Sequence, residues 1–153
     1  EKLAPIVTPK HLTGADAKAY QLGGEVFRRE SHCMTCHQAD GKGMAKVYPP
    51  LVSSPWVTGD EERLIKLTLH GLWGKIEVNG TTYEPSKGVP PMTAFHALLK
   101  DQEVAAVLTY VRNTWGNKAP AVKADAVKKV RAASKSRNMF WKPEELLRAH
   151  PMK

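Results

Sequence analysis

The chain is 153 residues long, 42% of them hydrophobic, and it carries a formal net charge of +8. This length and apolar content are enough for one hydrophobic core, so we expect a single globular domain. No apolar run is long enough to cross a membrane, so we expect no membrane span in this chain. The sequence begins at Glu1 without a signal-like stretch, which predicts a mature secreted protein or a domain of a longer chain.

The first helix is predicted over residues 14–30. Thr13 is a good N-cap for it. Its apolar residues recur at helical spacing and form one face: Ala15, Ala19, Leu22 and Val26.

This helix leads into Cys33-Met34-Thr35-Cys36-His37, a C-x-x-C-H motif that is typical of c-type haem attachment. The two thiols add across the vinyl groups of the porphyrin, at a separation that the two-residue gap sets. The histidine that follows the second thiol then lies under the iron as its proximal ligand. The motif therefore predicts a covalently bound haem in an extracytoplasmic protein.

Two other kinds of site use a C-x-x-C pair. A structural zinc site needs four ligands, but Cys33 and Cys36 are the only cysteines and the remaining histidines show no H-x(3–5)-H spacing. A thioredoxin-type dithiol needs a βαβ context, whereas the residues before Cys33 are predicted to be helical. Both alternatives stay open, and haem attachment is favoured.

The loop after the motif contains Tyr48-Pro49-Pro50. A proximal histidine needs a hydrogen-bond partner for its other ring nitrogen, commonly a backbone carbonyl. Pro49 or Pro50 is suited to this role because proline keeps its carbonyl acceptor and has no N–H.

Two further helices and a hairpin are predicted downstream. One helix follows a capping box at residues 58–61 and ends at Gly71. A β-hairpin is predicted over residues 76–83 about an Asn79-Gly80 turn. The last helix of this part starts near Asp101 and stops at Gly116, with one apolar face: Val104, Val107, Leu108 and Val111.

The sixth iron ligand decides between electron transfer and ligand binding. Methionine is the usual choice where the potential must be high. Met34 lies inside the attachment motif, and Met44 is too close to His37 to reach the other face of the ring. Met92 lies far downstream of His37, behind two prolines that hold the segment extended. We expect Met92 to be the ligand, although filling a gap in the core is the commonest role of methionine.

Residues 118–153 hold most of the positive charge: ten Lys or Arg against three Asp or Glu give +7, and residues 1–117 give +1. A helix is predicted around Val122, Ala126, Val130 and Ala133, with basic residues on its other side. A second is predicted from Pro143. We expect the apolar residues of this region to be buried: Phe140, Trp141, Leu146 and Leu147. The basic face is either a solvated surface or a docking surface for an acidic partner.

These features together resemble a class I cytochrome c over residues 13–117. The resemblance implies an all-α fold with a small β-hairpin insertion and a C-terminal helical extension. It implies residues 1–12 as an N-terminal tail, 13–117 as the haem domain and 118–153 as a basic extension packed on it. In this family the first and last helices cross, a role that suits Gly23, Gly24, Phe27 and Tyr110. The implied cofactor is one covalent haem c, attached to Cys33 and Cys36 and ligated by His37 and Met92.

A narrower likeness, over residues 76–83 and 106–117, is to the cytochrome modules of periplasmic oxidoreductases. It implies an electron carrier in the periplasm rather than an enzyme. The implied partner is a redox protein such as a copper nitrite reductase, a quinoprotein-type dehydrogenase or a terminal oxidase, and no nucleic acid. Lys100 departs from the serine that usually precedes the last helix, and we expect Asp101 to cap it. We expect an exposed haem edge to be flanked by Lys42, Met44, Ala45, Pro91, Thr93 and Ala94.

A second function stays open. A haem protein with an open iron site would bind small ligands, or act as a peroxidase-like enzyme or a sensor. It requires that Met92 does not ligate the iron, and His96 is its candidate distal acid or base. His70 and His96 are also the alternatives for a bis-histidine site, although neither has a rigid proline-flanked setting.

Overall fold

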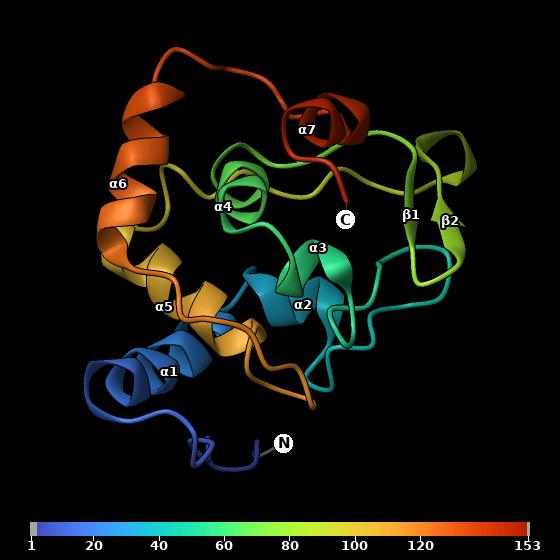
Figure 1. Ribbon diagram of the computed structural model, residues 1–153. Helices are drawn as coiled ribbons and strands as arrows, with labels where there is room; N and C mark the ends of the chain where they lie inside the picture. Colours follow the sequence, from blue (N-terminus) through green and yellow to red (C-terminus); the bar gives the residue numbers. More distant parts are fainter. Residues whose placement is uncertain (1–2, 153) are drawn as a thin grey trace.

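The computed structural model describes residues 3–152, and its helices enclose one core beside a two-stranded antiparallel sheet (Figure 1). The all-α expectation is therefore correct only approximately. The elements of the described part follow in chain order: α1 Gly14–Phe27, α2 Cys33–His37, α3 Pro55–Thr58, α4 Glu61–His70, β1 Ile76–Val78, β2 Thr81–Tyr83, the 3-10 helix η1 Pro85–Lys87, α5 Asp101–Val111, α6 Ala124–Ala133 and α7 Pro143–Ala149.

Helices α1 and α5 cross in close contact, as the resemblance implied. A Cβ atom at Gly23 would lie 2.0 Å from the carbonyl oxygen of Ala106, so only glycine allows this approach. The ring of Tyr110 packs 4.9 Å from Tyr20 and 5.3 Å from Phe27, measured between centroids. Gly24 does not take part in the crossing, because it faces Ile6 of the N-terminal segment.

The helix ends differ from those predicted. Helix α1 ends at Phe27 rather than residue 30, before Ser31 takes a positive φ of 63°. Helix α5 ends at Val111 rather than Gly116, because the Thr114 hydroxyl and the Asn113 amide donate back to helix carbonyls and close the last turn. Local features therefore end both helices: a left-handed residue after α1, and side-chain hydrogen bonds to carbonyls four residues back in α5.

The start of α5 also corrects an expectation. Lys100 occupies the N-cap position, and its backbone N–H donates to the Glu103 carboxylate over 2.9 Å. Asp101 is the first helical residue and does not cap. Its carboxylate instead pairs with Arg131 of α6, whose Nε atom lies 2.7 Å from Asp101 Oδ1.

The start of α4 differs from the predicted capping box. Asp60 is the N-cap, and its carboxylate accepts a hydrogen bond from the Arg63 N–H over 2.8 Å. Thr58 belongs to the short helix α3, which was not predicted. Ser54 caps α3 and Pro55 takes its first position, an arrangement that suits proline because it needs no N–H there.

The β1–β2 hairpin forms as predicted. Its register pairs Ile76 with Tyr83 and Val78 with Thr81. Asn79 and Gly80 both have positive φ, as a two-residue primed turn requires.

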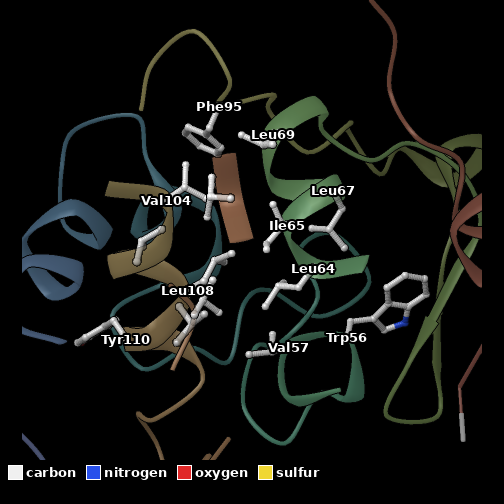
Figure 2. Packing of buried hydrophobic residues seen from close by; sticks show 14 of the residues in the cluster. Trp56, Val57, Leu64, Ile65, Leu67, Leu69, Phe95, Val104, Leu108 and Tyr110 are labelled. Carbon is white, nitrogen blue, oxygen red and sulfur yellow. The ribbon is translucent and has the colours of Figure 1, made fainter. Parts of the chain in front are cut away.

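The core lies between α4 and α5 (Figure 2). Figure 2 shows Leu64 and Ile65 of α4 facing Val104 and Leu108 of α5, with Phe95 above them. These side chains are at most 4% exposed. This core fixes the position of α4. It thereby also positions the segment around Leu72 that follows α4 and the Met92 segment that is bonded to it.

Residues 118–152 extend this core. Helix α6 packs on α4 and α5 through Val127 and Val130, whereas Ala133, which was expected on the buried face, is exposed. Leu146 of α7 is fully buried, but Phe140 is 37% exposed, so the expected burial of that ring is wrong. At the other end, the described residues 3–12 pack on α1 through Ile6. Residues 1, 2 and 153, which belong to the predicted tail and extension, lie outside the described residues.

Candidate haem-binding site

The C-x-x-C-H motif forms helix α2, Cys33–His37. Residues three apart in a helix lie on the same face, so the two sulfur atoms point the same way. Cys33 and Cys36 are not joined in a disulfide. Burial raises the pKa of the Cys33 thiol to about 12, and its backbone hydrogen bond only partly opposes this effect.

Two neighbouring cavities open beside α2, with volumes of about 320 and 80 Å³. Cys33, His37 and Met92 line both of them, although Met92 is distant from the motif in the sequence. Of the other predicted site residues, Cys36 lines the larger cavity, Pro50 the smaller, and Pro49 both. The fold thus brings all six predicted residues together.

The smaller cavity is walled by core side chains, among them Leu64, Leu67 and Leu108. Together, the two cavities offer apolar walls, two thiols, an imidazole and a thioether, a set that fits the chemistry of a c-type haem. It does not suit zinc, because no three His, Cys, Asp or Glu side chains within residues 3–152 gather as a metal-binding group.

His37 is held by the loop that follows it. Its Nδ1 atom lies 2.8 Å from the Pro49 carbonyl oxygen, so Nδ1 carries the proton and donates, and Nε2 keeps its lone pair for a metal. Burial lowers the pKa of His37, which favours the neutral imidazole that metal binding needs. Of the two prolines considered, Pro49 makes this contact.

Gly43 allows the loop to return to His37. Its φ is +65°, and a Cβ atom there would lie 2.2 Å from the Tyr48 carbonyl oxygen. Its N–H donates to the His37 carbonyl over 2.9 Å. The role of this glycine was not predicted, because its signal is the close approach of a backbone that only the folded loop provides.

Met92 is fixed by its backbone to the segment after α4. Its N–H donates to the Leu72 carbonyl over 2.8 Å, and the Leu72 N–H returns a longer bond of 3.4 Å. The Phe95 and His96 N–H groups then donate to carbonyls of Thr68 and Leu69 in α4. The Met92 segment is therefore hydrogen-bonded both to α4 and to the residue Leu72 that follows this helix.

The two histidines considered as alternative ligands lie elsewhere. Their rings stack on one another with centroids 5.1 Å apart, and the His70 Nε2 atom lies 3.0 Å from the Ser134 hydroxyl. Neither His70 nor His96 lines either cavity.

Several residues of the larger cavity were not predicted. Trp73 lines it and is 48% exposed, so it lies at the opening. His32 also lines it, and its buried Nε2 atom has no hydrogen-bond partner within residues 3–152. Pro91 and Thr93 line the cavity, whereas four other residues expected at a haem edge do not: Lys42, Met44, Ala45 and Ala94.

Helices around a C-x-x-C-H turn whose histidine is buried, with a distant methionine on the same cavity, define a class of small haem proteins. The chain belongs to the cytochrome c family, whose model matches residues 20–115. It carries one covalently bound haem c, and the function of this domain is electron transfer through that haem.

Two kinds of relative are similar to this chain. Cytochrome c-552 of Thermus thermophilus is 39% identical over 131 residues, which cover 79% of this chain and 82% of that protein. The cytochrome c subunit of the quinone alcohol dehydrogenase of Gluconacetobacter polyoxogenes is 33% identical over 71% of this chain. The fructose dehydrogenase cytochrome subunit of Gluconobacter japonicus is 34% identical over 69%. The matches cover only 22% and 21% of these two subunits.

Of the helices within residues 3–152, none combines the length and apolar character needed to cross a membrane.

Proposed function

We propose that the protein is a monohaem electron carrier, or the carrier domain of a larger redox enzyme, with His37 and Met92 as axial ligands. Cys33 and Cys36 form the two thioether bonds. One observation carries the proposal: all four side chains line the same cavity of about 320 Å³, although Met92 is far from the other three in the sequence.

When bound, the haem supplies a one-electron couple between ferric and ferrous iron. The residues of the chain set the conditions for that couple. The Pro49 carbonyl holds His37 in one tautomer and orientation, and the Leu72 backbone holds Met92. The apolar wall of α4 and α5 excludes water, which favours the less charged reduced state and raises the potential. Rigid ligands keep the rearrangement on electron transfer small.

We propose an extracytoplasmic, periplasmic location and a redox enzyme as partner. Covalent attachment suits a protein that must keep its cofactor outside the cytoplasm. The likeness to cytochrome subunits of an alcohol and a fructose dehydrogenase supports a dehydrogenase as the partner. A free carrier would migrate as a monomer, whereas a subunit would copurify with its enzyme, so size-exclusion chromatography of the native protein separates the two.

An optical spectrum tests the ligation directly. We expect the ferric protein to be low-spin with a methionine–iron charge-transfer band, and the reduced protein to be unchanged by carbon monoxide. A high-spin spectrum that shifts with carbon monoxide would overturn the proposal and favour an open site for small ligands. His96 does not support that alternative, because it is exposed and stacks on His70 away from the cavity.

A further inference from the structure

Leu72 pairs with two other segments, one on each side. On one side it forms an antiparallel bridge with Met92, and on the other a parallel bridge with Trp141. The Trp141 N–H donates to the Gly71 carbonyl over 3.1 Å, and the Trp73 N–H donates to the Trp141 carbonyl over 3.0 Å. The backbone segments around Met92, Leu72 and Trp141 therefore lie side by side in one hydrogen-bonded ladder, with Leu72 in the middle, although they come from separate parts of the sequence.

Packing at Gly71 shows how tightly this ladder is closed. A Cβ atom there would lie 2.3 Å from the Met92 carbonyl oxygen and 2.7 Å from the Phe140 ring. Gly71 also has a φ of +78°. The backbone of Met92 and the side chain before Trp141 thus meet at one glycine, with no room for a side chain between them.

The segment around Trp141 forms the outer side of this ladder and is held in place by residues 137–150, which we call the C-terminal strap. The Arg137 guanidinium lies 3.5 Å above the Trp141 ring and pairs with Glu145 over 2.8 Å. The Leu146 side chain is fully buried, and the carbonyl of His150 accepts a 2.7 Å hydrogen bond from the buried Arg63 of α4. The strap is therefore fastened to α4, the helix that also holds the residues after Met92.

Arg131 of α6 holds the same loop from its far end. Its guanidinium donates to the carbonyls of His96 and Leu99 and pairs with Asp101. Residues after position 118 thus support the Met92 segment at two places, once through Leu72 and once through residues 96–99.

We propose that Trp141 is a positioning residue for Met92, and that the strap keeps this thioether in the haem cavity against local opening. The inference rests on the proposed ligation by Met92. An iron ligand is lost when its segment opens, and the apparent affinity of a competing ligand rises with the open fraction. The strap lies on the outer side of the ladder. Weakening its contacts therefore raises the open fraction of the Met92 segment without changing the residues that line the cavity.

Imidazole binding to the intact ferric holoprotein at pH 7, followed by absorbance, measures the open fraction. Trp141→Ala removes the ring that Arg137 covers. The substitution keeps the backbone hydrogen bonds of the ladder but removes the side-chain packing that holds Trp141 in place, so we expect imidazole to bind about tenfold more tightly. Amide hydrogen exchange of Met92 in the reduced protein should lose protection by the same factor. Trp141→Phe should stay near the wild type, because the buried Nε1 atom of Trp141 has no partner within residues 3–152.

Val127→Ala is the matched control. Val127 of α6 is fully buried but makes neither the ladder contacts nor the Arg131 contacts to residues 96–101, so we expect its truncation to act on overall stability. We expect a lower melting temperature with imidazole affinity within about twofold of the wild type. Equal changes in affinity for Trp141→Ala and Val127→Ala would overturn the proposal, as would an unchanged affinity for Trp141→Ala.

Arg137→Ala provides a second variant if Trp141→Ala fails to take up haem. It keeps the tryptophan and removes the cation above it, so we expect a smaller increase, about threefold. No increase would overturn the proposal. Failure of the proposed function is recognised separately: a wild-type protein that lacks the methionine–iron band would fail before any variant is compared.

Discussion

Gly43 occupies a position where any side chain would disturb the partner of His37. The Tyr48 and Pro49 carbonyl oxygens lie 2.2 and 2.7 Å from the place that a Cβ atom would take. The Pro49 carbonyl is also the acceptor for the His37 imidazole. A side chain at position 43 would therefore displace the carbonyl that orients His37.

We expect Gly43→Ala to lower the free energy of unfolding by about 3 kcal/mol, which combines left-handed backbone strain with the displacement of a backbone carbonyl. Gly80→Ala is the control, because Gly80 also has a positive φ but has no neighbour within 4 Å of its Cβ position. It should cost only about 1 kcal/mol. Denaturant unfolding of both variants measures the difference, and equal losses would contradict a special role for the loop.

His70 is a buried histidine whose charge state affects stability. Burial lowers its pKa, and the nearby positive charges of His96, Arg137 and Arg131 add to this effect. The unfolded chain therefore takes up a proton near pH 6.5 while the folded chain still resists it. The stability that neutral His70 contributes is complete above that pH and is lost as the pH falls below it.

We expect His70→Gln to reduce the fall in unfolding free energy between pH 7.5 and pH 5.5, because glutamine does not titrate and can still hydrogen-bond Ser134. Urea unfolding at both pH values measures this. If the variant and the wild type lost the same stability over this interval, another group would be responsible.

At the scale of elements, the α1–α5 crossing depends on one of two adjacent glycines. Gly23 faces backbone, with the Ala106 carbonyl oxygen 2.0 Å from its Cβ position, whereas Gly24 faces only the side chain of Ile6. Backbone cannot move aside without separating the helices, but the end of an isoleucine can.

Alanine favours a helix interior by about 1 kcal/mol over glycine, so both substitutions gain in local propensity. We expect Gly23→Ala nevertheless to destabilise the protein by about 2–3 kcal/mol through overpacking. Gly24→Ala should lie within about 1 kcal/mol of the wild type, since the Ile6 side chain can shift. Thermal unfolding compares the two, and similar melting temperatures would mean that the crossing tolerates a methyl group.

The elements that could be predicted from the sequence are those that are specified by neighbouring residues. The hairpin was predicted because Asn79-Gly80 specifies its turn, whereas the C-x-x-C-H motif predicted haem attachment but not the short helix α2 that it forms. The ends of α1 and α5 were misplaced because the apolar periodicity does not mark the residues where a left-handed backbone or a side-chain hydrogen bond ends the helix. Helix α3 was missed because Ser54-Pro55 opens only a single helical turn. The pairing of Leu72 with Trp141 has no local signal at all, since the two residues are far apart in the sequence.

The candidate site divides in the same way. His37 was predicted from its place in the C-x-x-C-H motif and Met92 from its residue type and its proline-stiffened segment, and both line the cavity. Trp73 and His32 were not chosen, because nothing in their immediate sequence distinguishes a cavity-lining aromatic from any other. Their position depends on how the segment after α4 returns past α2, which is a property of the assembled core.

For the molecule as a whole, the uneven charge raises the question of whether the basic extension guides a partner. Several of its basic residues are already used in contacts with acids, including Lys123 with Asp16 and Arg131 with Asp101. Lys128 and Lys129 are exposed on α6, which lies across the molecule from the β1–β2 hairpin (Figure 1). The larger cavity is lined by Tyr83 of that hairpin and by no residue of α6.

The charge of α6 is therefore separated from the opening through which we expect electrons to pass. Because exposed charges are screened beyond about 10 Å at 0.1 M salt, reversing Lys128 and Lys129 together to glutamate should change the rate of oxidation by ferricyanide by less than about twofold. Lys42 does not line the cavity, but it precedes Gly43, whose N–H donates to the His37 carbonyl, so Lys42→Glu should slow the same reaction more strongly and leave the potential nearly unchanged. Stopped-flow rates at several ionic strengths measure both. A larger effect from the α6 pair would contradict this separation of the α6 charge from the site of electron transfer.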